Sequence, residues 1–190
     1  MDHLLAVCTG ILCRLPLLAG LLIRKAARRG VEASVYASGT AAGIQTPPLV
    51  VLAGAEHMGV DLSGHQPEQV TAGHLRSADR VLLGAILAHV RELVVLDGDA
   101  WTRTFTVKEL VRRGREHGPR PYRQYLRGWA AKVSTGRTIR DLLGESVEGD
   151  VAYPFGGSDA DYRRTVAELD ALGTELGALL WPPGPRRVPG

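Results

Sequence analysis

The stretch that most constrains the fold covers residues 4–29, where a short apolar run and a helix-forming run flank a brief loop. Residues 4–7 have the length and apolar character of a buried parallel strand. Residues 15–29 predict a helix that tolerates Pro16 in its first turn and ends at Gly30. A loop between such a strand and helix can turn its backbone N–H groups inward, so it favours an anion-binding site.

The remaining chain repeats this alternation of strand and helix. Further strands are expected at residues 32–36, 80–83 and 102–106. Helices are expected at residues 49–58, 70–76, 86–96, 107–117, 122–133 and 159–180, although 93–96 also fits a strand. Alternation of this kind predicts an α/β fold whose parallel sheet is covered on both faces and binds ligands at the carboxyl ends of its strands.

Length and composition favour one domain. The chain has 190 residues, 45% of them hydrophobic, which suits a single domain over residues 1–180 with a flexible tail at 181–190. The net charge of +3 does not demand nucleic acid as a partner. The apolar run at 15–23 is far shorter than the roughly 20 residues of a membrane span. For that reason we expect no membrane partner. Both cysteines lie in one loop, so we expect no secreted disulfide scaffold and a cytoplasmic location.

Cys8 and Arg14 are the candidate chemical groups of the first loop. The helix end and the Arg14 charge would stabilise a Cys8 thiolate and make it a nucleophile near neutral pH. The guanidinium of Arg14 suits bidentate contact with phosphate oxygens. The alternative is that Cys8 is only a small buried hydrophobe.

The loop sequence Val-Cys-Thr-Gly-Ile-Leu-Cys-Arg-Leu-Pro at residues 7–16 resembles the signature C-x-G-N-x-C-R-S/T-P of the low-molecular-weight protein tyrosine phosphatases. Further matches to that family follow in order at residues 38–40, 59–65, 78–83, 104–109 and 150–157. The resemblance implies a three-layer α/β sandwich with a four-stranded parallel sheet in the order 2-1-3-4. It also implies Cys8 as nucleophile, no metal and no cofactor. The oxyanion-binding residues that it implies are Thr9, Gly10, Ile11, Leu12, Cys13 and Arg14.

Several departures from the family pattern fall on groups that handle protons or brace the loop. Ile11 replaces an Asn that takes a left-handed conformation, which is costly for a β-branched residue. Leu15 replaces a Ser or Thr that donates to the thiolate, and Ala37 replaces another serine. Tyr153 replaces the general-acid Asp before Pro154, and a phenol of pKa near 10 is a poor base at neutral pH.

Other residues near these positions have two interpretations each. Asp150, Asp159 or Asp161 could supply the missing acid, but the last two also suit the first turn of the helix at 159–180. His65 keeps the family's position and is either a supporting residue of the site or a turn histidine. Cys13 could form a regulatory disulfide with Cys8, or simply pack against the helix.

Three functions remain open. The favoured one is a pseudophosphatase that binds a phosphorylated protein or a small anion at the Cys8–Arg14 loop without efficient turnover. The second is an active cysteine-dependent phosphatase, in which Tyr153 stands in the acid's place. The third is a non-catalytic interaction module, for which a homodimer through the apolar residues Ile11, Leu12 and Leu15 is one form.

Overall fold

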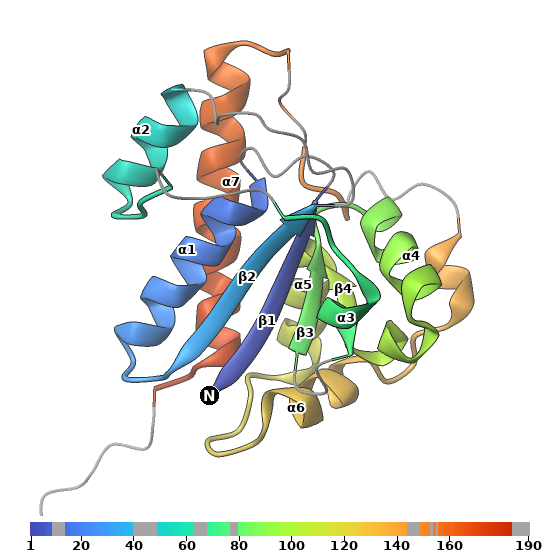
Figure 1. Ribbon diagram of the computed structural model, residues 1–190. Coiled ribbons are helices and arrows are strands. Elements are labelled where there is room, and N and C mark those ends of the chain that lie inside the picture. Colours follow the sequence, from blue (N-terminus) through green and yellow to red (C-terminus); the bar gives the residue numbers. More distant parts are fainter. Residues whose placement is uncertain are drawn as a thin grey trace, which may run out of the picture.

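A four-stranded parallel sheet forms the centre of the protein (Figure 1). The computed structural model describes residues 1–8, 14–39, 49–62, 68–76, 80–143, 149–152, 154 and 156–183. The strands are β1 (Asp2–Cys8), β2 (Ala33–Gly39), β3 (Arg80–Gly84) and β4 (Thr104–Thr106). Their order is β2-β1-β3-β4, which confirms the predicted order 2-1-3-4. β1 therefore lies between β2 and β3, and Cys8 at its end pairs with Gly39.

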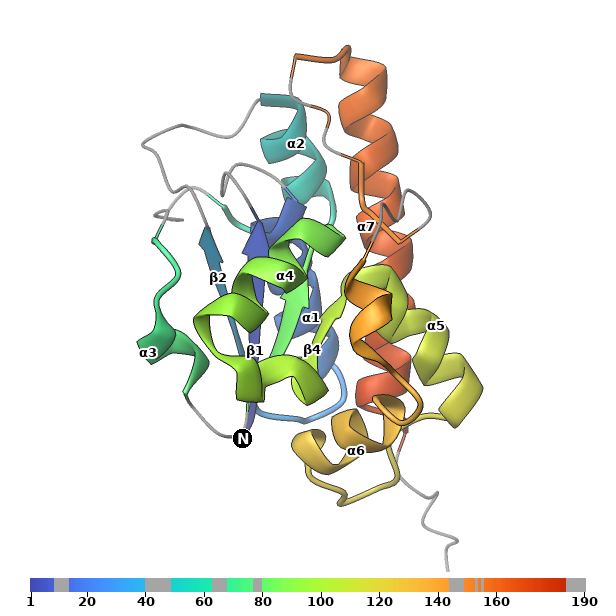
Figure 2. The same cartoon turned by 90° about the vertical axis from the view of Figure 1, so that its right-hand side faces the viewer.

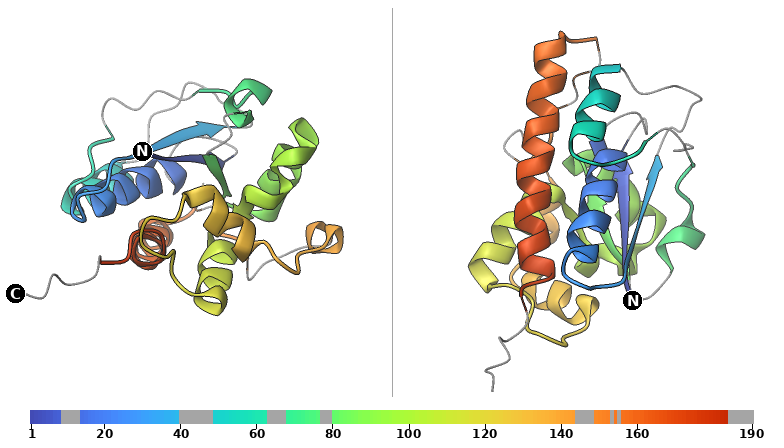
Figure 3. Two further views of the ribbon diagram at one scale, coloured as in Figure 1. Left: turned by 90° about the horizontal axis from the view of Figure 1, so that it is seen from below. Right: turned by 90° about the vertical axis from the view of Figure 1, so that its left-hand side faces the viewer.

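Helices cover both faces of the sheet, as Figure 2 and the right-hand view of Figure 3 show. The α-helices are α1 (Arg14–Ala27), α2 (Leu49–His57), α3 (Ala72–Leu75), α4 (Leu87–Leu96), α5 (Val107–His117), α6 (Leu126–Val133) and α7 (Asp159–Leu180). Two 3₁₀ segments, η1 (Gly98–Arg103) and η2 (Ile139–Leu142), precede β4 and follow α6. In the described part of the chain, no helix has both the length and the apolar composition of a membrane span.

Alternation along β1 separates two hydrophobic cores. Leu4, Ala6 and Cys8 point into the larger core, which also holds the buried faces of α1, α5, α6 and α7. Leu5 and Val7 point to the other face and pack with side chains of α3, α4 and η1. Successive side chains of a strand point to opposite faces, so the near-continuous apolar run is what a sheet covered on both sides requires.

Two sequence predictions about the second half of the chain are wrong. Residues 122–125 precede α6 instead of extending it, because Arg123 has a φ of 69°, in the left-handed region where a helix cannot continue. The tail was expected to begin at 181, but Trp181 is buried and its Nε1 donates to Asp2 Oδ2 at 2.7 Å. Arg120 pairs with the same carboxylate at 2.7 Å, so the end of α7 is fixed against the start of β1.

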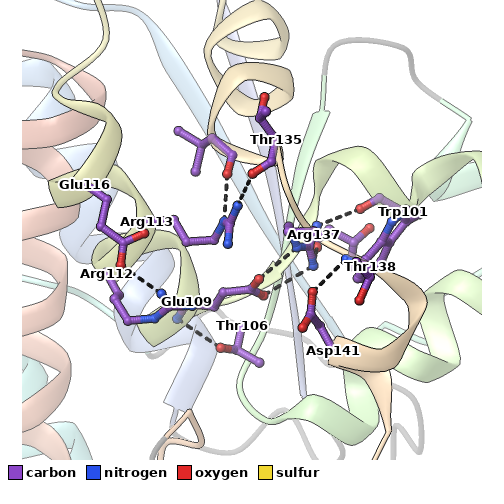
Figure 4. Close-up of polar contacts among 12 residues, drawn as sticks. Trp101, Thr106, Glu109, Arg112, Arg113, Glu116, Thr135, Arg137, Thr138 and Asp141 are labelled. Carbon is purple, nitrogen blue, oxygen red and sulfur yellow. Dashed lines mark hydrogen bonds and ion pairs between the residues drawn. The ribbon is translucent and has the colours of Figure 1, made fainter.

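Arg137 joins β4 and α5 to the segment after α6 (Figure 4). Its guanidinium donates to the carbonyls of Trp101 and Thr104 at 2.9 and 2.8 Å, and its Nε lies 2.8 Å from a carboxylate oxygen of Glu109. It also stacks on the ring of Trp101, 3.8 Å from the centroid. These contacts hold the start of α5 next to the carboxyl end of β4.

Candidate active site

Cys8 and Arg14 lie on either side of the first β–α turn, at the carboxyl end of β1. Cys8 is the last residue of β1 and is 0% exposed, while Arg14 is the first residue of α1 and is 2% exposed. β1 has a parallel neighbour on each side, so this end of the strand is where an open α/β sheet binds its ligands. The structure therefore places the predicted thiol and guanidinium at the same edge of the sheet.

A chain of hydrogen bonds connects Arg14 to a segment more than 130 residues further along. Arg14 Nη1 donates to the carbonyl oxygen of Val151 at 2.9 Å, and this contact is buried. The Val151 N–H donates to the carbonyl of Ala85 at 2.9 Å, and the Ala85 N–H donates to the carbonyl of Val7 at 3.2 Å. The main chain at 151 is thereby fixed beside the arginine and beside the end of β1.

Asp150 stabilises the start of α4. Its Oδ1 accepts a hydrogen bond of 2.8 Å from the backbone N–H of Leu87, the first residue of that helix. This N–H has no partner within the helix, and no side chain of the helix itself caps it. The carboxylate thus serves as a cap contributed by a distant segment.

The two aspartates at the start of α7 also have structural roles. Asp161 forms a capping box with Ser158, whose backbone N–H donates to Asp161 Oδ2 at 2.9 Å, and these bonds lower the pKa of the carboxyl group. Asp159 is exposed in the first turn, where a negative charge interacts favourably with the helix dipole. The interpretation of both residues as part of the helix start is confirmed.

His89 is the residue of this region that the sequence reasoning missed. It is 0% exposed on the buried face of α4, between Leu87, Val90 and Leu93. Burial, together with the positive charge of Arg14, lowers the pKa of His89 from 6.5 to about 4. The imidazole is therefore neutral at physiological pH. A polar residue on an otherwise apolar helix face is the sequence signal that could have identified it.

Several predicted site residues lie outside the described part of the chain. These are Thr9, Gly10, Ile11, Leu12, Cys13, His65 and Tyr153. Leu15, which stands in place of the thiolate's hydroxyl donor, is described and is fully buried in the larger core. The disulfide between Cys8 and Cys13 and the roles of His65 and Tyr153 stay predictions.

The described residues contain no cluster of three or more His, Cys, Asp or Glu side chains arranged to hold a metal ion. The expectation that the protein works without a metal or cofactor stays a prediction.

Fold and site together define an open parallel α/β domain with a cysteine and an arginine flanking the loop after its first strand. Residues 3–131 match the family model of the low molecular weight phosphotyrosine protein phosphatases. The chain belongs to this family, as its sequence resemblance predicted. The match ends before the segment at 150–157, which contains the position of the general acid.

Solved structures show the same fold. YwlE from Bacillus subtilis, as a mutant, has 24% identity and a TM-score of 0.67, with 93% of this chain and 97% of that one covered. The YwlE arginine phosphatase from Geobacillus stearothermophilus has 23% identity and a TM-score of 0.65, with 93% and 91% covered. The tyrosine phosphatase Wzb from Escherichia coli K30, in complex with sulphate, has 19% identity and a TM-score of 0.63, with 93% and 96% covered. A comparison with curated protein sequences gave no significant match.

Proposed function

We propose that this member of the family binds a phosphoryl or related oxyanion at the Cys8–Arg14 loop and turns it over poorly or not at all. Cys8 and Arg14 flank the loop as an anion site requires, and Arg14 is anchored through the carbonyl of Val151. A guanidinium positioned in a buried environment binds an oxyanion more strongly than one in water. The ligand would be a phosphorylated protein or a small anion.

The observation that carries the impaired-turnover part of the proposal is the role of Asp150. It is the acid nearest in sequence to Tyr153, and its Oδ1 already accepts a hydrogen bond from Leu87 in a cap of α4. Asp159 and Asp161 belong to the start of α7. Asp150 and Asp161 would therefore have to give up hydrogen bonds at a helix start to act as a general acid, and such acid–base help is worth about 10²–10⁴ in rate.

The surroundings of the thiol support the same proposal. Leu15 is fully buried and offers no hydroxyl to Cys8, which lies in the same apolar core. In the family pattern the hydroxyl at this position donates to the thiolate and favours its nucleophilic form, and leucine does not supply that hydrogen bond.

The alternative is an active cysteine-dependent phosphatase. It is favoured by the family assignment and by Cys8 and Arg14 at the end of β1. The Cys8 sulfur would attack phosphorus and form an S–P bond as the P–O bond to the leaving group breaks, and Tyr153 would protonate that leaving group. Water would then give a proton to the Tyr153 phenolate and attack phosphorus, which breaks the S–P bond and releases phosphate and the thiolate. Among the neighbours, one is an arginine phosphatase and another a tyrosine phosphatase, so phosphoarginine and phosphotyrosine are both candidate substrates.

One assay separates these functions. Hydrolysis of para-nitrophenyl phosphate, a phosphotyrosine peptide and a phosphoarginine peptide is measured for the wild type, Cys8→Ser and Tyr153→Asp, with Asp159→Asn as the control. We expect little activity in the wild type, higher activity in the single variant Tyr153→Asp, and unchanged activity in the control Asp159→Asn. A further gain in Ile11→Asn/Leu15→Ser/Tyr153→Asp would support a dismantled site. Rates typical of ordinary phosphatases in the wild type, lost in Cys8→Ser, would refute impaired turnover.

Anion binding is tested separately, by calorimetric titration of inorganic phosphate into the reduced protein. We expect binding in the wild type and in Cys8→Ser, and a large loss in Arg14→Gln whose fold is checked by circular dichroism. No binding by the wild type would leave an interaction module as the remaining function.

A further inference from the structure

A hollow lined by three arginines lies far from the candidate active site along the sheet. It has a volume of about 440 Å³ and is lined by Ala72, Arg76, Leu96, Asp97, Asp99, Arg103 and Arg127. We call it the arginine hollow. Its residues come from α3, the end of α4, η1 and α6, and Figure 2 shows these elements toward the end of the sheet where β1 begins. Cys8 and Arg14 lie at the opposite, carboxyl end.

Arg103 forms the fixed base of the arginine hollow. Its side chain is 8% exposed, and Nη2 donates to the carbonyl of Leu75 at 2.6 Å and lies 3.4 Å from Asp97 Oδ2. Burial lowers the pKa of Arg103, the charge of Arg127 adds to this effect, and the two aspartates oppose it. A buried cation with a second cation beside it makes this place electrostatically suited to an anion.

Arg76 and Arg127 provide the exposed part of the lining. Both are exposed, and neither has an ion-pair partner within the described part of the chain. Asp99 is likewise exposed, and among the described residues its carboxylate is in no ion pair. The hollow thus combines three guanidinium groups with two carboxylates, one of which, Asp97, is already beside Arg103.

We propose that the arginine hollow binds a small phosphate monoester, at a second site distinct from the Cys8–Arg14 loop. Guanidinium forks match the oxygens of a phosphate group, and about 440 Å³ is within the range of small-molecule sites. Arg76, Arg103 and Arg127 bind the phosphate, and Asp99 accepts a hydrogen bond from a hydroxyl or amino group of the ligand's organic part.

The test is a titration of the ¹⁵N-labelled protein with glycerol 3-phosphate and with inorganic phosphate, followed by amide NMR shifts. The amides of Ala72, Leu96 and Asp99 report on the arginine hollow, whereas those of Val7 and Val151 report on the candidate active site. We expect saturable shifts at the first group. The two sets of amides respond to binding at different sites. A lack of binding at one site can therefore be detected independently of binding at the other.

Variants define the roles of the lining residues. Loss of two charge-assisted contacts in Arg76→Gln/Arg127→Gln should weaken binding at the hollow at least about tenfold. Arg163→Gln, which removes one exposed charge from α7, should leave it unchanged. Asp99→Asn should tighten the binding of inorganic phosphate, because a repulsive negative charge is lost. It should also reduce the ratio of the affinity for glycerol 3-phosphate to the affinity for inorganic phosphate.

Three results would overturn the proposal. They are the absence of saturable shifts at the hollow, equal weakening by Arg163→Gln, and unchanged affinity in Arg76→Gln/Arg127→Gln. The second would mean that phosphate responds only to the overall charge of the protein, since exposed charges act diffusely and are screened by salt.

Discussion

The neutral, buried His89 makes the stability of the protein dependent on pH. The pKa of this histidine is lowered from 6.5 to about 4 by burial and by Arg14. An unfolded chain therefore binds a proton at His89 between these two pH values, whereas the folded protein does not. The part of the free energy of unfolding that depends on a neutral His89 is therefore fully present above pH 6.5, and it is lost as the pH falls toward 4.

The size of the effect follows from the two pKa values. Each unit of separation corresponds to about 1.4 kcal/mol, so the full loss is about 3 kcal/mol and the loss from pH 7 to pH 5 is about 2 kcal/mol. The His89 side chain is 0% exposed, so solvent screening does not reduce this figure much.

Urea unfolding followed by circular dichroism at pH 7 and pH 5 measures the effect. His89→Gln should lower stability at pH 7, because a packed side chain is exchanged, and should reduce the difference between the two pH values by about 2 kcal/mol. His57→Gln, at the exposed end of α2, is the matched control and should keep the wild-type difference. An unchanged pH difference in His89→Gln would refute a neutral histidine beside Arg14.

Three further substitutions test the packing that positions the site, each by urea or thermal unfolding. Asp150→Ala should lower the free energy of unfolding by about 1 kcal/mol because the α4 cap is lost, and Asp159→Ala should lower it by less. Equal losses in the two variants would contradict the capping role of Asp150. Arg137→Met should cost about 3–5 kcal/mol because it leaves a largely buried carboxylate unpaired, and a cost below 1 kcal/mol would disprove that account. Gly20→Ala should cost about 1–3 kcal/mol, since the new Cβ would lie 2.2 Å from Val60 Cγ1; a neutral result would show that the valine moves freely.

The sequence alone determined the alternation of elements and the position of the candidate loop. Apolar runs of strand length and helix-spaced runs with caps are local properties, so β1, α1, α5 and α7 could be predicted within a few residues. The order of the strands required the family resemblance, because neighbours in a parallel sheet are distant in sequence.

Local signals failed where a long-range contact or an unusual backbone angle decided the structure. Residues 122–125 have helical composition, but the left-handed φ of Arg123 keeps them out of α6. Trp181 stands in a stretch rich in Pro and Gly, yet its ring is buried and bonded to Asp2, 179 residues away. No window of the sequence around either position contains that information.

At the site, the sequence determined which residue types are present, and the tertiary structure decided which groups they contact. Cys8 and Arg14 could be identified as candidate site residues from their spacing, because both flank the same short loop. The contact of the Asp150 carboxylate with the first N–H of α4 could not be predicted from the sequence. The carbonyl of Val151 against Arg14 and the burial of His89 depend on contacts between segments far apart in the chain, so only the folded protein defines them.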